Sequence, residues 1–148
     1  MKTVQRPWDW WAYHYRVVHR GQIPGIGEWD DKLIELVVAV LDLNPGDRVL
    51  DLASGSGDHA RRLAALGMDV VGVEIAPSLV EYSRQQAAEQ GLETIEFRAG
   101  DMRAIDYKDE FDAVLLLSCS FGFFDDETNE AMLLRIARAL KQDGGRVL

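Results

Sequence analysis

Several features are scarce or absent in the chain, and each absence excludes a class of protein. A single cysteine, Cys119, excludes an intrachain disulfide and a zinc site built from several thiolates, and it is typical of a reducing compartment. No apolar run approaches the length needed to cross a bilayer, and the first residues lack the continuous apolar segment of a secretion signal. We therefore expect a cytoplasmic protein that makes no membrane contact.

Positive charge is also scarce. The chain has 16 Lys and Arg residues against 25 Asp and Glu residues, which gives a formal net charge of -9. Nucleic-acid binders usually carry a basic patch, and none is visible in the sequence, so no nucleic-acid partner is expected. The three histidines, His14, His19 and His59, show no metal-ligand spacing with one another or with Cys119, so we expect no bound metal.

The order of the expected elements defines the fold class. Apolar segments with helical spacing alternate with short apolar runs bounded by turn residues, at intervals typical of βαβ units. The expected strands are 48–52, 69–74, 94–99, 111–117 and a beginning at 146–148, and the expected helices are 8–20, 28–43, 58–66, 77–90 and 126–140. The sequence therefore predicts an α/β fold with a doubly wound, mostly parallel sheet that is covered by helices on both faces.

The loop after the first expected strand carries the strongest functional signal. The strand contains Asp51 and passes into small residues, among which Gly55 and Gly57 can adopt positive φ. Asp58 is expected to cap the helix that follows, and the free N–H groups at the start of that helix attract a phosphate or a carboxylate. Because Gly55-x-Gly57-x-x-Ala60 also fits the dinucleotide-binding pattern, the loop alone leaves two cofactor classes open.

Residues at the ends of the next two strands extend this site, because ligands of open parallel sheets lie beyond the carboxyl ends of the strands. Glu74 suits a ribose, since one carboxylate can accept hydrogen bonds from both hydroxyl groups. Asp101 can accept a hydrogen bond from an exocyclic amine, and Ile75 and Met102 can pack on the two faces of a base. Taken singly, Asp101 is equally well explained as a turn former, and the two apolar residues as core.

Four separated segments together resemble the class I S-adenosylmethionine-dependent methyltransferases of the small-molecule type. In chain order they are Asp51-Leu52-Ala53-Ser54-Gly55-Ser56-Gly57, then Glu74, then Gly100-Asp101-Met102, then Leu116-Leu117-Ser118. The resemblance runs from about residue 28 to the C-terminus, and it implies a Rossmann-like fold with S-adenosylmethionine as the cofactor. Ala53 stands where the most glycine-rich form of the first segment has a glycine.

The resemblance also implies which residues contact the cofactor. The methionine moiety would lie at Asp51, Ala53, Ser54, Gly55, Ser56 and Gly57, the ribose at Glu74, the adenine at Ile75, Asp101 and Met102, and the sulfonium near Leu117 and Ser118. No catalytic residue is identified, because the methyl group is already activated and the main task is to align the acceptor for in-line transfer. We expect a small-molecule acceptor, whose proton a His or Tyr could take.

The resemblance also bears on domain organisation. Folds of this class usually hold seven strands, whereas this sequence stops at Leu148, inside the fifth. We therefore expect a truncated domain over residues 28–148 with a complete cofactor half, an incomplete acceptor half and an unpaired apolar edge that would favour self-association. Residues 1–27 are expected to form an aromatic helix and loop, in which Trp8 to Tyr15 either close over the site as a lid or pack on the flank of the domain.

Two other functions stay open on the sequence alone. The glycine pattern is compatible with an NAD(P)-dependent oxidoreductase, although the dinucleotide fingerprint assigns no role to Asp51 or Asp101. The missing strands are compatible with a non-catalytic module that binds the cofactor or a protein partner. The methyltransferase accounts for more of the residues at the strand ends.

Overall fold

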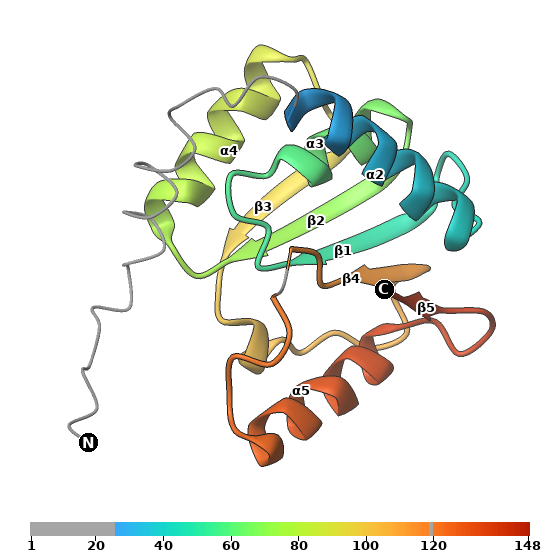
Figure 1. Ribbon diagram of the computed structural model, residues 1–148, viewed down its shortest axis with the longest axis vertical. Helices are drawn as coiled ribbons and strands as arrows, with labels where there is room; N and C mark the ends of the chain where they lie inside the picture. The colour runs from blue at the N-terminus through green and yellow to red at the C-terminus, as the bar shows by residue number, and fades with distance from the viewer. Residues whose placement is uncertain (1–25, 119) are drawn as a thin grey trace.

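The computed structural model describes residues 26–118 and 120–148, which form a five-stranded sheet between two layers of helices (Figure 1). The elements are α2 (Ile26–Val40), β1 (Arg48–Leu52), α3 (Asp58–Ala65), β2 (Asp69–Glu74), α4 (Pro77–Glu89), β3 (Ile95–Ala99), the short 3-10 helix η1 (Met102–Ala104), β4 (Ala113–Leu115), α5 (Asp126–Ala139) and β5 (Arg146–Val147). The strand order is β3-β2-β1-β4-β5, and all four pairings are parallel. The predicted α/β fold class is confirmed.

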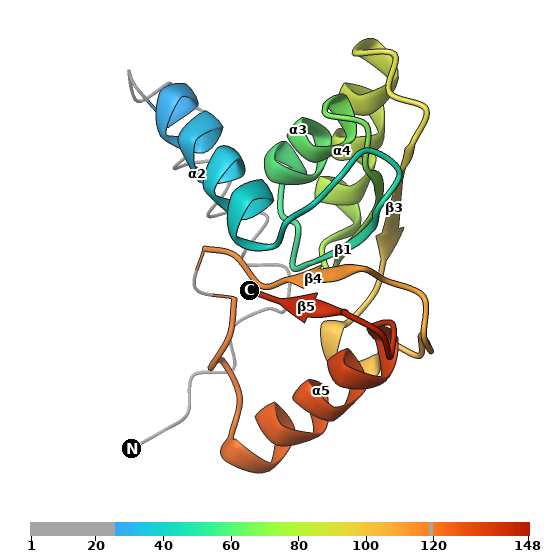
Figure 2. The same ribbon diagram turned by 90° about the vertical axis from the view of Figure 1, so that its right-hand side faces the viewer.

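Alternating side chains along the strands build a core on each face of the sheet. Val49 of β1 packs with residues of α2, α3 and α4, whereas its neighbour Leu50 packs with residues of α5 and η1. Figure 2 shows the same division, with α2, α3 and α4 on one side of the sheet and α5 on the other. Because both faces are covered, the inner strands are apolar on both sides, as the sequence predicts.

The chain changes direction across the sheet between β1 and β4. From β1 the chain runs outward to β2 and β3, and then returns to the other side of β1 to form β4 and β5. The loops that leave the carboxyl ends of these two central strands therefore diverge, and the crevice between them is where open α/β sheets bind ligands. The topology thus places the loops after β1, β2, β3 and β4 around one edge of the sheet.

Several element boundaries differ from the sequence expectation, and the differences at α2 and β4 are the largest. The helix expected to reach residue 43 ends at Val40, because Asp42 adopts a positive φ of 48° and leaves the helical course. The strand expected over 111–117 is confined to Ala113–Leu115. Phe111 makes only an isolated parallel bridge to Leu140, so the apolar run extends beyond the regular ladder at its start.

The expectation that Asp58 caps α3 is wrong. Gly57 occupies the N-cap position with φ 73°, and no side chain caps the helix there. Asp58 lies instead in the first turn, where its carboxylate pairs with Arg61 one turn later. A carboxylate in the first turn still favours the helix, because it faces the positive end of the helix dipole.

Some predictions concern residues outside the described ranges. The aromatic segment and Cys119 belong to these, so the lid and the domain division at residue 27 stay predictions. Strand β5 is the edge strand on the β4 side of the sheet, and its Val147 is exposed. Self-association through this edge stays a prediction. Among the helices of the described ranges, none is long and apolar enough to cross a membrane.

Gly72 in the middle of β2 makes room for an aromatic ring. It pairs in register with Asp51 on β1 and with Phe97 on β3. A Cβ at Gly72 would lie 2.6 Å from Cδ1 and 2.8 Å from Cε1 of Phe97, so the ring occupies the space of the missing side chain. Because Phe97 is buried in the core, the ring has little freedom to move away.

We therefore expect Gly72→Ala to destabilise the protein by about 1–3 kcal/mol, because the added methyl group forces the Phe97 ring out of its place. Urea unfolding followed by circular dichroism measures the change. Gly100→Ala is the matched control, since a Cβ there would meet only Val73 Cγ1 at 3.4 Å, and a change within about 0.5 kcal/mol is expected. Equal stability of the two variants would contradict the argument.

Candidate functional site

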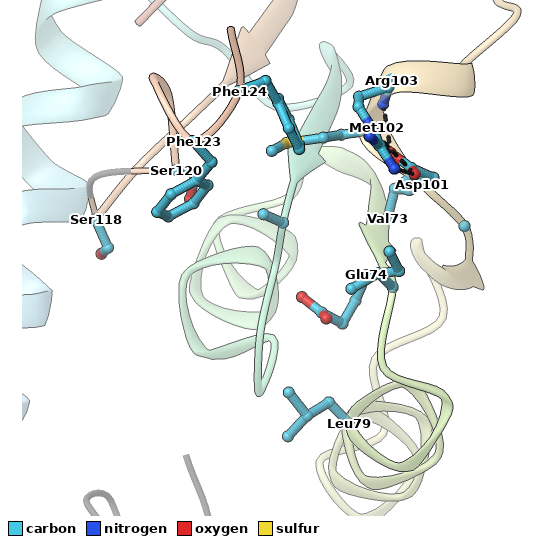
Figure 3. A pocket seen from close by; sticks show the side chains of 13 residues that line it. Val73, Glu74, Leu79, Asp101, Met102, Arg103, Ser118, Ser120, Phe123 and Phe124 are labelled. Carbon is cyan, nitrogen blue, oxygen red and sulfur yellow. Dashed lines mark hydrogen bonds and ion pairs between the residues drawn. The ribbon is translucent and has the colours of Figure 1, made fainter. Parts of the chain in front are cut away.

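A cavity of about 380 Å³ lies at the carboxyl ends of β2, β3 and β4 (Figure 3). Its volume is in the range of small-molecule sites. The end of β2, the start of α4 and the segments that follow β1, β2, β3 and β4 line it: Ala53, Val73, Glu74, Ile75, Leu79, Gly100, Asp101, Met102, Arg103, Ser118, Ser120, Phe123 and Phe124. The lining therefore combines a few polar groups with a larger number of apolar side chains.

A second, smaller cavity of about 170 Å³ lies on the α2 and α3 side of the same edge. It is lined by Asp30, Leu33, Asp51, Ala53, Ser54, Ser56, Asp58, His59, Leu117 and Ser118. Ala53 and Ser118 line both cavities, so the ends of β1 and β4 form a common wall between them. One elongated ligand that passes this wall could occupy both.

The two residues of the common wall share an unusual backbone conformation. Ala53 and Ser118 both have φ of 56°, a left-handed value that non-glycine residues seldom adopt. At Ala53 this explains why the glycine-rich form of the loop has glycine at this position. The chain turns sharply at both strand ends, and the turns leave room for the two cavities.

Two buried side chains, Phe97 and Arg61, hold the glycine loop in place. A Cβ on Gly57 would lie 2.6 Å from Cζ of Phe97, so the loop rests directly on that ring. Arg61, which is buried, donates a hydrogen bond to the carbonyl of Ser56 at 2.6 Å and pairs with Asp58. The Ser56 hydroxyl group also bonds to the Asp58 carboxylate, which closes the network.

Glu74 is buried at the end of β2 and accepts hydrogen bonds from two backbone groups. Its Oε2 accepts from the N–H of Gly55 at 3.0 Å, and its Oε1 accepts from the N–H of Ala76 at 2.9 Å. These bonds tie the glycine loop to β2 and fix the plane of the carboxylate. Each oxygen atom keeps a lone pair with which it can accept another donor.

Asp51 is a buried carboxylate with an unsatisfied oxygen. Burial raises its pKa to about 7, and the negative charge of Glu74 adds to the rise. Among the described residues, its Oδ2 has no hydrogen-bond partner, and the same holds for the hydroxyl oxygen of Ser54. Since both residues line the smaller cavity, that cavity presents an acceptor for a cationic donor.

Asp101 already has a partner within the protein. Its carboxylate accepts a hydrogen bond from the backbone N–H of Arg103 at 2.9 Å and forms a two-point ion pair with the Arg103 guanidinium group. The hydrogen bonds from Arg103 hold the pKa of Asp101 below its usual range. Arg103 and Phe124 also lie together at this end of the larger cavity (Figure 3).

Ten of the twelve residues predicted for the site line the two cavities. Asp51, Ala53, Ser54, Ser56, Leu117 and Ser118 line the smaller one, and Ala53 and Ser118 line the larger one together with Glu74, Ile75, Asp101 and Met102. Gly55 and Gly57 do not line either cavity. Gly55 acts through its N–H bond to Glu74, and Gly57 through its contact with Phe97.

Several cavity residues were not predicted from the sequence. Asp30 and His59 face the smaller cavity, with 3.6 Å between His59 Nε2 and Asp30 Oδ1. Nothing in the sequence marks this pair, because α2 and α3 meet only in the folded chain. Arg103 was detectable in principle, since an acid two residues before an arginine can form a local ion pair, as Glu96 and Arg98 also do.

The fold and the two cavities define an α/β protein with candidate ligand sites at the carboxyl edge of a parallel sheet, where open α/β sheets bind nucleotide-like ligands. The sequence profile of the methyltransferase-domain family matches residues 49–144, which is most of the chain. The protein therefore belongs to this family, the class I methyltransferases, for which S-adenosylmethionine is the methyl donor. The match decides between the two cofactor classes that the glycine loop left open.

Two relatives each match part of this chain. The uncharacterized protein Rv1405c of Mycobacterium tuberculosis is 37% identical over 81 residues, which are 54% of this chain and 29% of that protein. The 23S rRNA (uracil(1939)-C(5))-methyltransferase RlmD of a Shewanella species is 45% identical over 60 residues, 40% of this chain and 13% of RlmD. Thus the chain spans less than a third of either relative.

A solved structure extends the likeness to the whole fold. The PH0226 protein of Pyrococcus horikoshii superposes with a TM-score of 0.76 at 26% identity, over 89% of this chain and 62% of that one.

Within the ranges that the structure describes here, no group of three or more His, Cys, Asp or Glu side chains is arranged to hold a metal ion.

The raised pKa of Asp51 predicts a specific pH dependence of stability. Between its ordinary value and about 7, the folded protein binds a proton that the unfolded chain has released, so this stabilising contribution is lost as the pH rises through about 7. Relative to Asp51→Asn, the wild type should lose unfolding free energy, on the order of a few kcal/mol, between about pH 5 and pH 8. Urea unfolding of both proteins across this range measures the difference.

Asp101→Asn is the control for this prediction. Its carboxyl has a lowered pKa, so its contribution changes only at more acidic pH. The difference between the wild type and Asp101→Asn should therefore stay constant between about pH 5 and pH 8. A constant difference for Asp51→Asn over the same range would show that the Asp51 pKa is not raised.

Proposed function

We propose that the chain binds S-adenosylmethionine across both cavities and methylates a small-molecule acceptor. The larger cavity would take the adenosine part and the smaller cavity the methionyl part, with the sulfonium beside the wall formed by Ala53 and Ser118. This assignment is supported by the position of that wall, which borders both cavities. It also accounts for the placement of ten predicted residues around one continuous edge of the sheet.

The unsatisfied carboxylate of Asp51 carries the proposal. A buried carboxylate oxygen without a partner destabilises the fold, and a cationic donor from a ligand removes that cost. The ammonium group of the methionyl moiety has the right charge and donor count for Asp51 and for the Ser54 hydroxyl beside it. A nicotinamide dinucleotide offers no ammonium group for this position.

The larger cavity contains acceptors suited to an adenosine. Glu74 keeps one lone pair on each carboxylate oxygen, which suits the two hydroxyl groups of a ribose. Ile75 and Met102 supply apolar surface for the base, and Asp101 supplies an acceptor for the amino group. These roles follow from the chemistry of the lining residues.

The residues of this chain would act by binding, orienting and excluding water. Bound S-adenosylmethionine supplies a methyl group that is already activated for displacement. Alignment of two bound reactants can lower the activation free energy by roughly 7–11 kcal/mol, so a site that fixes the donor can work without a dedicated base. We assign no general base among the described residues.

Two features of the chain support a small-molecule acceptor. The net charge of -9 opposes binding to a phosphate backbone. Phe121 and Phe123, which are about half exposed at 47% and 49%, lie on the loop after β4, and Phe123 also lines the larger cavity. Apolar rings beside the methyl donor suit an organic acceptor. An RNA acceptor, suggested by the name of the relative RlmD, is the alternative outcome.

Calorimetry with S-adenosylhomocysteine tests the cofactor assignment. We expect binding to the wild type, and a loss of about 10- to 100-fold in affinity for Asp51→Asn, because a hydrogen bond to a charged group is lost. Since the ligand cation favours ionised Asp51, affinity should rise as the pH rises through about 7, with proton release visible in buffers of different ionisation enthalpy.

Two controls accompany this titration. Asp69→Asn changes a carboxylate at the opposite end of β2 and should leave the affinity unchanged. NADH should not bind. Binding of NADH without binding of S-adenosylhomocysteine would refute the cofactor assignment.

Radiolabelled methyl transfer tests the acceptor class. The protein is incubated with labelled S-adenosylmethionine and a bacterial extract. Label should appear in small molecules that separate from S-adenosylmethionine itself, in excess of the extract without added protein. Asp51→Asn should reduce the amount transferred. Label that enters RNA and is released by ribonuclease would refute the small-molecule proposal. Cofactor binding without any transfer would favour a non-catalytic module.

A further inference from the structure

We infer that Arg103 is a positioning residue that orients Asp101 for the amino group of the adenine and thereby sets the preference for adenine over other bases. The inference rests on the proposed function, because it assigns the larger cavity to adenosine. Arg103 was not among the residues predicted from the sequence, and the contacts of its side chain carry the argument.

The first contact is a two-point ion pair with Asp101. Arg103 Nε lies 3.0 Å from both carboxylate oxygens, and Nη2 donates to Oδ2. The backbone N–H of Arg103 donates to Oδ1 at 2.9 Å, so the same residue holds the carboxylate at three donors. A guanidinium group fixes the plane of a carboxylate in this arrangement, whereas a lysine ammonium group would not.

The second contact restrains the guanidinium group. Its central carbon lies 4.6 Å from the centre of the Phe124 ring, within the range of a cation–π interaction. Phe124 belongs to the loop after β4, whereas Asp101 and Arg103 follow β3. Arg103 therefore links two loops that border the larger cavity, and Figure 3 shows the three side chains grouped at one end of it.

The number of donors leaves Asp101 a limited capacity. An ionised carboxylate has about four acceptor positions, and three donors of Arg103 already occupy most of them. About one position is left for a ligand. A 6-amino group can donate one hydrogen bond there, whereas a 6-oxo group at the same place brings an oxygen against a carboxylate that Arg103 prevents from turning away.

A second cluster of the chain provides a matched control. Arg98 forms the same kind of two-point pair with Glu96, two residues earlier, and its guanidinium carbon lies 5.7 Å from the centre of the Tyr107 ring. None of these three residues lines the larger cavity. Arg98→Ala therefore removes an equivalent ion pair and ring contact at a distance from the proposed base site.

The test compares two ligands by calorimetry: S-adenosylhomocysteine and S-inosylhomocysteine, which carries a 6-oxo group in place of the 6-amino group. The wild type and Arg98→Ala should prefer the amino ligand by about tenfold or more. In Arg103→Ala the preference should fall to about threefold or less, through weaker binding of the amino ligand and a smaller penalty on the 6-oxo ligand. Arg103→Lys should not restore it, because lysine lacks the fork.

The outcomes separate this inference from the proposed function. Binding of S-adenosylhomocysteine to the wild type reports on the proposed function, and the preference between the ligands reports on Arg103. An unchanged preference in Arg103→Ala and Arg103→Lys, or an equal loss of affinity for both ligands, would overturn the positioning role. Thermal unfolding of each variant shows whether it is folded. Phe124→Leu removes the ring contact with Arg103 and keeps an apolar side chain in the cavity lining, so it should reduce the preference to an intermediate value.

Discussion

In the middle of the sheet, the ring of Phe97 lies against the bare backbone of Gly72, where any side chain would meet the ring. The same ring also contacts Gly57, so one aromatic side chain on β3 limits how closely the glycine loop after β1 can pack on the sheet. The loop then presents the N–H of Gly55 to Glu74 at the end of β2. One buried ring on β3 thus contacts both β2 and the loop after β1, and the cavities lie at the carboxyl edge of these strands.

The alternation of side chains along β1 explains why the Asp51 carboxylate is buried, which destabilises the fold and also makes the carboxylate available to a cationic ligand. Val49 and Asp51 point to the same face of the sheet, so the rule that buries Val49 also buries the carboxylate. Its pKa rises through burial and through the nearby charge of Glu74. A group that titrates near neutrality can exist uncharged in the empty protein and ionise when a cation arrives, which limits the stability lost in the free state.

The strands and the strand-end residues could be predicted because they depend on local patterns. Apolar runs, glycines and acids at run ends locate β1, β2 and β3 within a residue or two and bring Glu74, Asp101 and Met102 to the correct edge. Three-dimensional neighbours could not be predicted in this way. The proximity of Asp30 to His59 depends on how α2 packs on α3. The contact between Arg103 and Phe124 depends on the segments after β3 and β4, which come together only in the folded chain.

The left-handed residues Ala53 and Ser118 show that this edge is shaped before a ligand binds. A non-glycine residue in this region costs about 1–3 kcal/mol, and the surrounding contacts must offset that cost. After Ala53, the N–H of Ser54 donates to the carbonyl of Val73 on the neighbouring strand at 3.1 Å. After Ser118, the backbone N–H and the hydroxyl group of Ser120 both donate to the carbonyl of Leu117. Because these bonds already fix both turns, a ligand that spans the two cavities would not have to order the wall between them, and its binding energy would be available to align the reacting groups.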